Sequence, residues 1–472
     1  MSATFLAAVR ARSSEVRLDA TSNQTSAILS AIAAGKSAEL RELLRTTEAI
    51  PHAVNGCVNG RVPLLVAAGN DRVDLVRSLL LARAEPDIAG AQGKTALCIA
   101  AAAGDADTVG TLLKAKAAVD LAMSNGATAL ACACAGGARA YSRGSSHLDC
   151  CRVLLEHSAN ANARKSNGAT PLYMACQNAE GLALPMAKML IHNGGAEVNA
   201  LGPKGASPLY IACAEGHATL AALLLSHRAS PTEPADGGRT PLAVVVEERG
   251  PHAEALCNLL LDARSDPNAA KHNGITPLFL ACATLDRAGR LDGHTREAWK
   301  RQKARDAALC RDADGLSGLV DLLLASKADV EAADSGDVRP LWIAAHQGNA
   351  DAVTRLLDAR AGINEVALDE TTALWAACSQ GNYHCARVLV ECRADLTLPS
   401  RLTPLAVAKW HLANERRRPG GGGRGHDGVG EADDPAQSEQ TSRRSYHQVV
   451  ELLQNALTNS LAMGLAHSCV LP

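Results

Sequence analysis

Aromatic residues make up only 2% of this chain of 472 residues, although 47% of its residues are hydrophobic. Its interior must therefore be built from Ala, Leu, Val and Cys, which favours thin, closely packed helices over a thick sheet sandwich. No apolar run reaches the roughly 18 residues of a membrane-spanning helix. Lys and Arg number 47 against 49 Asp and Glu, so no strong field attracts nucleic acid or an anionic membrane.

Patterns typical of metal sites, disulfide frameworks and active sites are also missing. The 15 cysteines are odd in number, and no Cys-x-x-Cys pair occurs. The chain has no His-Glu-x-x-His, no Gly-x-Ser-x-Gly and no phosphate-binding loop, because the run Gly420–Gly423 precedes Arg424 and not Lys-Ser or Lys-Thr. We therefore predict no enzymatic activity, no metal and no cofactor.

One pattern of residues recurs along the chain with a base period of 33. Each copy has Leu, Ala, Gly, Val and paired Leu at nearly constant offsets from its first residue, and several copies begin with Thr-Pro-Leu or Ser-Pro-Leu. Insertions lengthen some spacings without disturbing the register of the flanking copies. The copies start at Ser26, Val62, Thr95, Thr128, Thr170, Ser207, Thr240, Thr276, Arg339, Thr372 and Thr403.

Each copy contains the signals of two short helices and a loop. The first Thr or Ser caps a helix with its hydroxyl group, and the next Pro suits the first helical turn. A Gly, as at Gly104, Gly216, Gly348 and Gly381, ends that helix, and the Val and Leu positions form the apolar stripe of a second helix. Asp or Asn eight residues before the next copy, and Gly two residues before it, predict a projecting hairpin-like loop.

A 33-residue helix–turn–helix unit with this Thr-Pro-Leu start resembles the ankyrin repeat. The resemblance covers about residues 26–457 and implies an all-α fold, an ankyrin-repeat solenoid of stacked helix–turn–helix units with projecting hairpin-like loops. The first and last copies are degenerate, and we expect them to act as end caps that shield the apolar ends of the stack.

The predicted organisation follows from these copies. We expect a disordered leader at 1–25, an N-terminal cap repeat at 26–61 and nine repeats over 62–402, with insertions near 136–146 and 284–315. A C-terminal cap repeat at 403–457 is interrupted by a Gly-rich loop at 416–442, which we expect to be flexible, and a tail follows at 458–472.

Two features depart from the family pattern. The usual His after Pro-Leu is replaced by aromatic residues in five copies, at Tyr173, Tyr210, Phe279, Trp342 and Trp375. We interpret these rings as filling space between repeats, and a stripe of interface anchors is the alternative. The Gly that lies two residues before the next copy is replaced by Asp337, Glu370 and Arg401 in the last copies. We therefore expect the last hairpins to be less regular.

Cysteines recur at one repeat position, six residues after the start of a copy, at Cys134, Cys176, Cys213, Cys282 and Cys378. Because these residues are one repeat apart, we expect buried core thiols in a reducing compartment and not a zinc site. Cys150 and Cys151 beside His147 and His157 form a denser cluster. Adjacent residues of a helix point to different faces, so we predict no metal there either.

The insertion at 284–315 provides the alternative function. It carries basic residues around Trp299, namely Arg296, Lys300, Arg301, Lys303 and Arg305. Such a cluster suits a regulatory module that binds nucleic acid or anionic lipid. We expect instead a solvated helix, because Glu297 and Asp306 offset part of its charge. The terminal Cys469-Val470-Leu471-Pro472 is similar to a prenylation box, but its final Pro is unfavourable for that modification.

The resemblance also implies where a partner binds. In ankyrin proteins, partners usually lie along the hairpin tips and first-helix faces of the concave side, just before each repeat begins and seven or eight residues after it. These positions fall here on Ser166, Asn167, Gln177, Asn178, Lys204, Glu215, Arg239, Glu247, Glu248, His272, Asn273, His346, Gln347, Asp369, Ser379 and Gln380.

That surface is polar and of mixed charge, which suits a protein partner better than nucleic acid. We therefore predict a protein-binding scaffold or adaptor that is monomeric and cytoplasmic, with the nucleus as the alternative location. Arg10, Arg12 and Arg17 are reminiscent of an organelle transit peptide, but Glu15 and Asp19 argue against targeting by that segment.

Overall fold

A computed structural model of the chain describes residues 22–46, 50–70, 72–136, 144–250, 252–283, 313–397, 402–415 and 444–459. The chain divides into two compact units, unit 1 at residues 1–230 and unit 2 at residues 231–472, and each is described by itself. The regular elements of the described residues are helices, which confirms the predicted all-α class.

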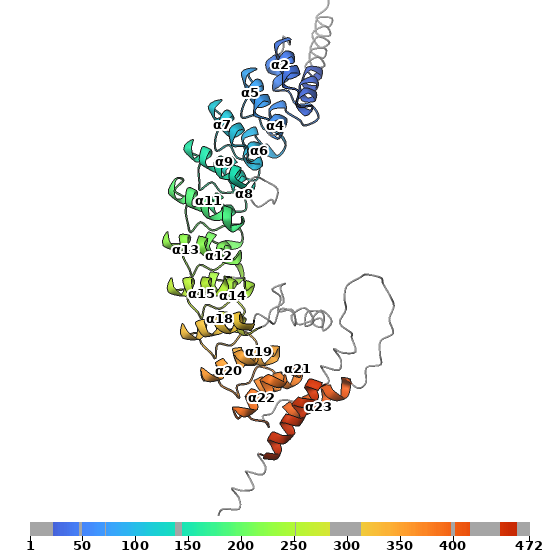
Figure 1. Cartoon of the computed structure of the whole chain (residues 1–472), viewed down its shortest axis with the longest axis vertical. Coiled ribbons are helices and arrows are strands. Elements are labelled where there is room, and N and C mark those ends of the chain that lie inside the picture. Colours follow the sequence, from blue (N-terminus) through green and yellow to red (C-terminus); the bar gives the residue numbers. More distant parts are fainter. Residues whose placement is uncertain are drawn as a thin grey trace, which may run out of the picture. The chain divides into compact units, whose positions relative to one another are not determined.

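Unit 1 consists of paired short helices that follow the predicted copies (Figure 1). A helix over residues 22–33 opens it. The elements that follow are α2 (Ser37–Thr46), α3 (Ile50–Val54), α4 (Pro63–Ala68), α5 (Val73–Leu81), η1 (Ala91–Gly93), α6 (Ala96–Ala103), α7 (Ala106–Lys114), α8 (Ala129–Gly136), α9 (Gly144–Glu156), α10 (Pro171–Cys176), α11 (Glu180–His192), η2 (Pro203–Gly205), α12 (Pro208–Ala214) and α13 (Ala218–Ser226).

Unit 2 repeats the same arrangement and ends with a helix over residues 444–459. Its other elements are η3 (Asp236–Gly238), α14 (Pro241–Glu248), α15 (Ala253–Asp262), α16 (Pro277–Cys282), α18 (Ala313–Ala325), α19 (Pro340–Gln347), α20 (Ala350–Asp358), α21 (Ala373–Gln380), α22 (Tyr383–Glu391) and α23 (Pro404–Glu415).

Within each unit the helices form two layers. In unit 1 the first helices α6, α8, α10 and α12 pack on one another in succession, and the second helices α7, α9, α11 and α13 do the same (Figure 1). The core lies between the layers, where Leu97 and Leu112 of one repeat are 2% and 0% exposed. Full burial of such a side chain contributes about 1.5–3 kcal/mol to the free energy of unfolding. Because helices of successive repeats also pack on one another, each repeat is stabilised by its neighbours as well.

The helix boundaries follow from the residues that were predicted to set them. The hydroxyl oxygen of Thr170 accepts a hydrogen bond of 3.2 Å from the backbone nitrogen of Tyr173, and Pro171 occupies the first turn of α10. Gly104 follows α6 with φ of 79°, a left-handed conformation that glycine adopts without steric cost. The capping and termination signals of the sequence are therefore used as predicted.

Asp and Asn eight residues before each copy have a role that the sequence analysis missed. They were predicted only as turn residues, but their side chains connect neighbouring repeats. The Oδ1 atom of Asn162 accepts a bond of 2.7 Å from the nitrogen of Glu197, and that of Asn268 accepts one of 2.7 Å from the nitrogen of Asp329. Asp87, Asp120, Asn199 and Asn364 make the equivalent bond, at 2.8 to 3.0 Å.

The expectation of less regular hairpins in the last repeats is wrong where the structure describes them. Asp337 and Glu370 replace the usual Gly, yet they adopt the same left-handed conformation, with φ of 51° and 61°. Their nitrogens donate to the carbonyl oxygens three residues earlier, at 3.1 and 2.9 Å, as Gly126 does at 2.8 Å. The rest of the loop imposes this conformation, so these two non-glycine residues are held in a strained backbone conformation.

Several predicted segments lie wholly or partly outside the described residues. These are 1–21 of the leader, 137–143 of the first insertion, 284–312 of the second insertion, residues 398–401, which include Arg401, 416–443, which include the Gly-rich loop, and 460–472 of the tail, which include Cys469. The described helix at 22–33 begins inside the segment for which a leader was predicted. None of the described helices has both the length and the apolar character needed to cross a membrane.

Candidate functional site

The tips of successive hairpin loops are joined by backbone hydrogen bonds. At five repeat starts, the residue four positions earlier donates its N–H group to a carbonyl oxygen of the preceding tip. In unit 1, Ser124 donates to Gln92 at 2.9 Å and Ser166 donates to Asn125 at 2.8 Å. In unit 2, three such bonds of 2.9 to 3.2 Å run from His272 to Gly237, from Ser335 to Asn273 and from Leu368 to Gly336. These five tips therefore present their side chains from a fixed backbone.

Most of the residues predicted to contact a partner lie on these tips or at the ends of the first helices. Nine of them are exposed, namely Ser166, Asn167, Gln177, Lys204, Glu215, Glu248, His272, Asn273 and Asp369. They differ in charge and include no large apolar side chain. Such a surface offers hydrogen bonds and charges and has little apolar area of its own.

Glu247 and Arg239 belong to a partly buried ion-pair cluster and are less available than predicted. The Oε2 atom of Glu247 lies 2.8 Å from Nη2 of Arg239 and 3.0 Å from Nζ of Lys271. The side chain of Glu247 is only 7% exposed. Because two cations share this carboxylate, the cluster holds the hairpins that carry Arg239 and Lys271 against α14.

Asn178 and Ser379 are buried, at 1% and 5% exposed, so they do not offer side chains to a partner. The amide nitrogen of Asn178 donates to the carbonyl oxygen of Cys134 at 2.9 Å, which ties one repeat to the preceding one. The hydroxyl group of Ser379 donates to the carbonyl oxygen of Ala376 at 2.8 Å. The repeat offset placed both residues at the end of a first helix, but it could not show that they turn inward.

The end of α19 is half-buried. The ring of His346 stacks on Trp342, with centroids 5.0 Å apart and an interplanar angle of 11°. Burial lowers the pKa of His346, because the charged imidazolium loses water contacts there. Gln347 on the same helix and Gln380 on α21 are also partly exposed. These residues can contribute to a contact surface only through part of their side chains.

The aromatic residues at the shared repeat position divide into two groups. Tyr173, Tyr210 and Phe279 are 7%, 8% and 3% exposed, which confirms that they fill space between repeats. Trp342 and Trp375 are partly exposed, and Nε1 of Trp342 donates to the hydroxyl group of Thr371 at 2.9 Å. The interpretation as interface anchors therefore stays open only for the two tryptophans.

The cysteines at the shared repeat position are core residues, as predicted. Cys134, Cys176, Cys282 and Cys378 are 0% exposed and Cys213 is 2% exposed. Burial raises the pKa of Cys176 and of Cys282 to about 12, which keeps both as thiols. Within the described ranges, no group of three or more His, Cys, Asp or Glu side chains is placed to hold a metal ion.

Cys151 has a closer neighbour than the sequence indicated. Its sulfur lies 3.8 Å from the sulfur of Cys134, on the preceding helix of the same repeat, and both residues are fully buried. Hydrogen bonding to Cys151, together with burial, raises the pKa of the Cys134 thiol. His147 is buried as well, and its Nε2 atom lies 3.2 Å from the carbonyl oxygen of Ala102.

Two exposed apolar residues were missed by the sequence analysis. Trp410, 54% exposed, lies seven residues after Thr403, the same offset that separates His346 from Arg339, so the repeat register could have identified it. Leu368, 69% exposed, lies on the hairpin tip before Thr372. The register also placed Ser166 and His272 on tips from the same position, four residues before a repeat start, so it could have identified Leu368 as well.

Comparison with known proteins follows the same repeats. A family model described as "Ankyrin repeats (3 copies)" matches residues 64–143, 138–201, 179–271 and 307–400. Comparison with curated proteins gives no match. Among solved structures, the human ASB11 ankyrin repeat domain is similar at 23% identity and a TM-score of 0.39, over 46% of this chain and 90% of that one. The chain belongs to the ankyrin repeat family, whose repeats are generally protein–protein interaction modules.

Proposed function

We propose that this chain is a protein-binding scaffold or adaptor, and that a partner protein contacts its hairpin tips and the adjoining ends of its first helices. The observation that carries the proposal is the row of exposed polar side chains on these tips, such as Ser166 and His272, whose backbone is fixed by bonds to the preceding tip. A rigid backbone lowers the entropy cost of binding, and varied side chains give specificity.

The proposal assigns no catalytic role to the chain. Ankyrin repeat proteins are typically non-enzymatic scaffolds, and the surface described above offers hydrogen bonds and charges for recognition.

We place the protein in the cytoplasm as a monomer, where thiols such as Cys176 and Cys282 remain reduced inside the core.

The test is affinity capture from native extract followed by mass spectrometry. One variant would replace Gln177, Glu215, Glu248 and His272 by Arg. These residues are exposed, so the replacements leave the core intact. Glu247 and His346 are left unchanged, since the first is a buried ion-pair partner and the second stacks on Trp342. The matched control would replace exposed residues of the second helices, namely Lys188, Asp262 and Asp358.

A partner that is lost with the tip variant and retained by the control supports the proposal. A third bait without residues 284–315 tests the alternative function of the basic insertion. If a partner, nucleic acid or anionic vesicle is lost only with that deletion, and binding weakens with salt, the function belongs to the insertion and the tip surface is wrong.

A further inference from the structure

The hairpin tip before α21 differs from the other tips in its central side chain. Ser124, Ser166, His272 and Ser335 occupy the position four residues before a repeat start, and each donates its N–H group to the preceding tip. Leu368 occupies this position before Thr372 and makes the same bond, at 3.2 Å to Gly336. The shared backbone arrangement therefore directs a leucine, 69% exposed, to a place where these four tips present polar groups.

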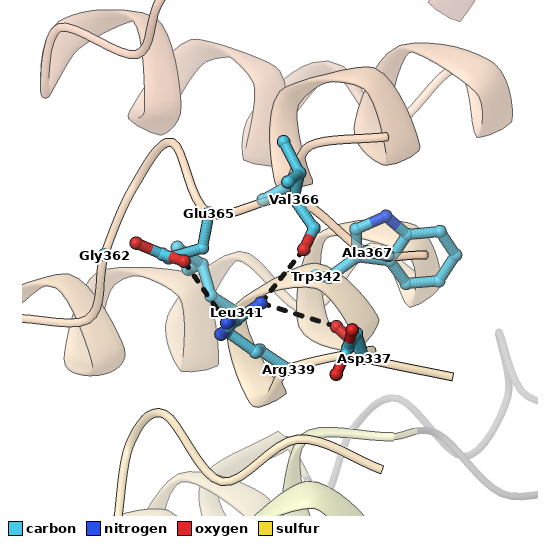
Figure 2. Close-up of a pocket in the computed structure, with 9 residues that line it drawn as sticks. Asp337, Arg339, Leu341, Trp342, Gly362, Glu365, Val366 and Ala367 are labelled. Carbon is cyan, nitrogen blue, oxygen red and sulfur yellow. Dashed lines mark hydrogen bonds and ion pairs between the residues drawn. The ribbon is translucent and has the colours of Figure 1, made fainter. Parts of the chain in front are cut away.

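The same hairpin carries a second exposed apolar residue. Val366, two residues earlier, is 44% exposed and lines a pocket together with Leu341 and Trp342 (Figure 2). The Trp342 ring is held by its stacking on His346 and by its bond to Thr371. We call Val366, Leu368 and Trp342 the Leu368 patch. It combines a fixed aromatic edge with two exposed aliphatic groups, which is typical of a site that receives one or two apolar side chains.

Carboxylates surround the Leu368 patch. The two hairpins at residues 331–339 and 362–372 carry Glu331, Asp334, Asp337, Glu365, Asp369 and Glu370, against one cation, Arg339. Arg339 lies between the hairpins (Figure 2), 3.2 Å from carboxylate oxygens of both Glu331 and Glu365. Its charge is therefore already neutralised.

Asp337 and Glu370 leave the surface negative. Both residues are exposed, and none of the ion pairs among the described residues involves either of them. A partner that places cations opposite these two carboxylates gains charge pairing in addition to apolar contact.

We infer that the Leu368 patch binds a short peptide segment of a partner protein that combines apolar residues with Lys or Arg. The inference rests on the proposed function and narrows it to one place and one partner chemistry. Apolar side chains of the segment cover Leu368, Val366 and the edge of Trp342, and its cations face Asp337 and Glu370.

The test is selection of displayed random peptides on the full chain, followed by fluorescence anisotropy with labelled copies of the enriched peptides. Two variants remove the two parts of the site. Leu368→Ser removes exposed apolar surface, and the double variant Asp337→Gly with Glu370→Gly removes two charges. Because both positions have positive φ, glycine relieves strain there, so a loss of binding in that variant does not come from unfolding.

Matched controls exist for both variants. Leu81→Ser changes another leucine, 82% exposed on α5. Arg360→Gly with Arg393→Gly makes the same backbone change at two exposed positions with φ of 67° and 66°, outside residues 331–339 and 362–372. Neither control alters the Leu368 patch or the carboxylates around it.

The expected result is enrichment of peptides that contain both Lys or Arg and large apolar residues. Each test variant should weaken their binding by about tenfold or more, and the controls should not. Enrichment of acidic or uncharged peptides, no enrichment, or binding that is insensitive to both variants overturns the inference. If the peptides respond only to changes at Gln177 and Glu215, the proposed function stands and this site is wrong.

The basic insertion of the chain is a competing occupant. If deletion of residues 284–312 raises the affinity of the full chain for the enriched peptides, that insertion occupies the Leu368 patch, and the assignment to a partner protein is overturned. Unchanged affinity after the deletion supports binding in trans.

Discussion

The guanidinium group of Arg249 donates a hydrogen bond of 2.7 Å to the carbonyl oxygen of Leu280 in the next repeat. The same nitrogen also donates to the carbonyl oxygen of Ala283, the residue that follows α16. The last carbonyl groups of a helix lack partners within it, and Arg249 supplies one for this short helix. Burial lowers the pKa of Arg249 to about 10.

Replacement of Arg249 by Lys is expected to destabilise unit 2 by about 1.5–3 kcal/mol, the range for hydrogen bonds to charged groups. A lysine has a single ammonium group, whereas Arg249 uses two donor atoms, because its Nε atom also donates to the carbonyl oxygen of Val246 at 3.4 Å. Urea unfolding followed by tryptophan fluorescence measures this, because the four tryptophans, Trp299, Trp342, Trp375 and Trp410, all lie in unit 2. The control Arg360→Lys, at an exposed position, should unfold like the parent, and equal stability of both variants would refute the role of Arg249.

Opposite effects are expected from glycine exchanges at one repeat position. Glu370→Gly should stabilise unit 2 by about 0.5–1 kcal/mol, because the relief of a left-handed non-glycine residue exceeds the entropy cost of glycine. Gly126→Ala should destabilise unit 1 by about 1–2 kcal/mol, since its φ is 77° and an added Cβ would lie 3.0 Å from the carbonyl oxygen of Arg164. Thermal unfolding followed by circular dichroism compares them, and shifts of the same sign would contradict the argument.

The bond between neighbouring repeats at Asn268 can be tested in the same way. Its Oδ1 atom accepts from the nitrogen of Asp329 at 2.7 Å, and its Nδ2 atom donates to the carbonyl oxygen of Lys327 at 3.3 Å. Asn268→Ala should lower the free energy of unfolding of unit 2 by about 1 kcal/mol, because the site is exposed and water replaces part of the bond. Asn258→Ala, at an exposed position of α15, is the control and should have little effect.

The repeat register predicted most of the fold because its signals are local. A Thr that caps a helix, as at Thr170, or a Gly with positive φ, as at Gly104, acts within a few residues of itself. The register also placed the contact residues on tips and helix ends. It could not separate the buried Asn178 from the exposed Gln177 beside it, since that difference depends on packing against the preceding repeat.

Other features depend on contacts between repeats that a single copy does not encode. The sequence alone suggested irregular hairpins at Asp337 and Glu370, but bonds from the neighbouring tip preserve the loop there. The bond from Asn268 to the next repeat likewise follows from stacking. Each arises where tertiary packing overrides a local preference.

The stability of unit 2 should fall at mildly acidic pH because of His346. Its ring stacks on Trp342, and its Nδ1 atom is buried and makes no hydrogen bond. Burial lowers its pKa from the usual 6.5, so the unfolded chain binds a proton at a higher pH than the folded chain. This group therefore contributes stability that is fully present above about pH 6.5 and is lost as pH falls through the lower folded pKa.

The slope from one such group cannot exceed about 1.4 kcal/mol per pH unit. His346→Gln removes the titrating group, so its free energy of unfolding should fall less between neutral and mildly acidic pH than that of the parent chain. Urea unfolding by tryptophan fluorescence at several pH values gives both curves. His384→Gln, at an exposed position of α22, should keep the slope of the parent, and a parallel decline in all three proteins would assign the pH dependence to other groups.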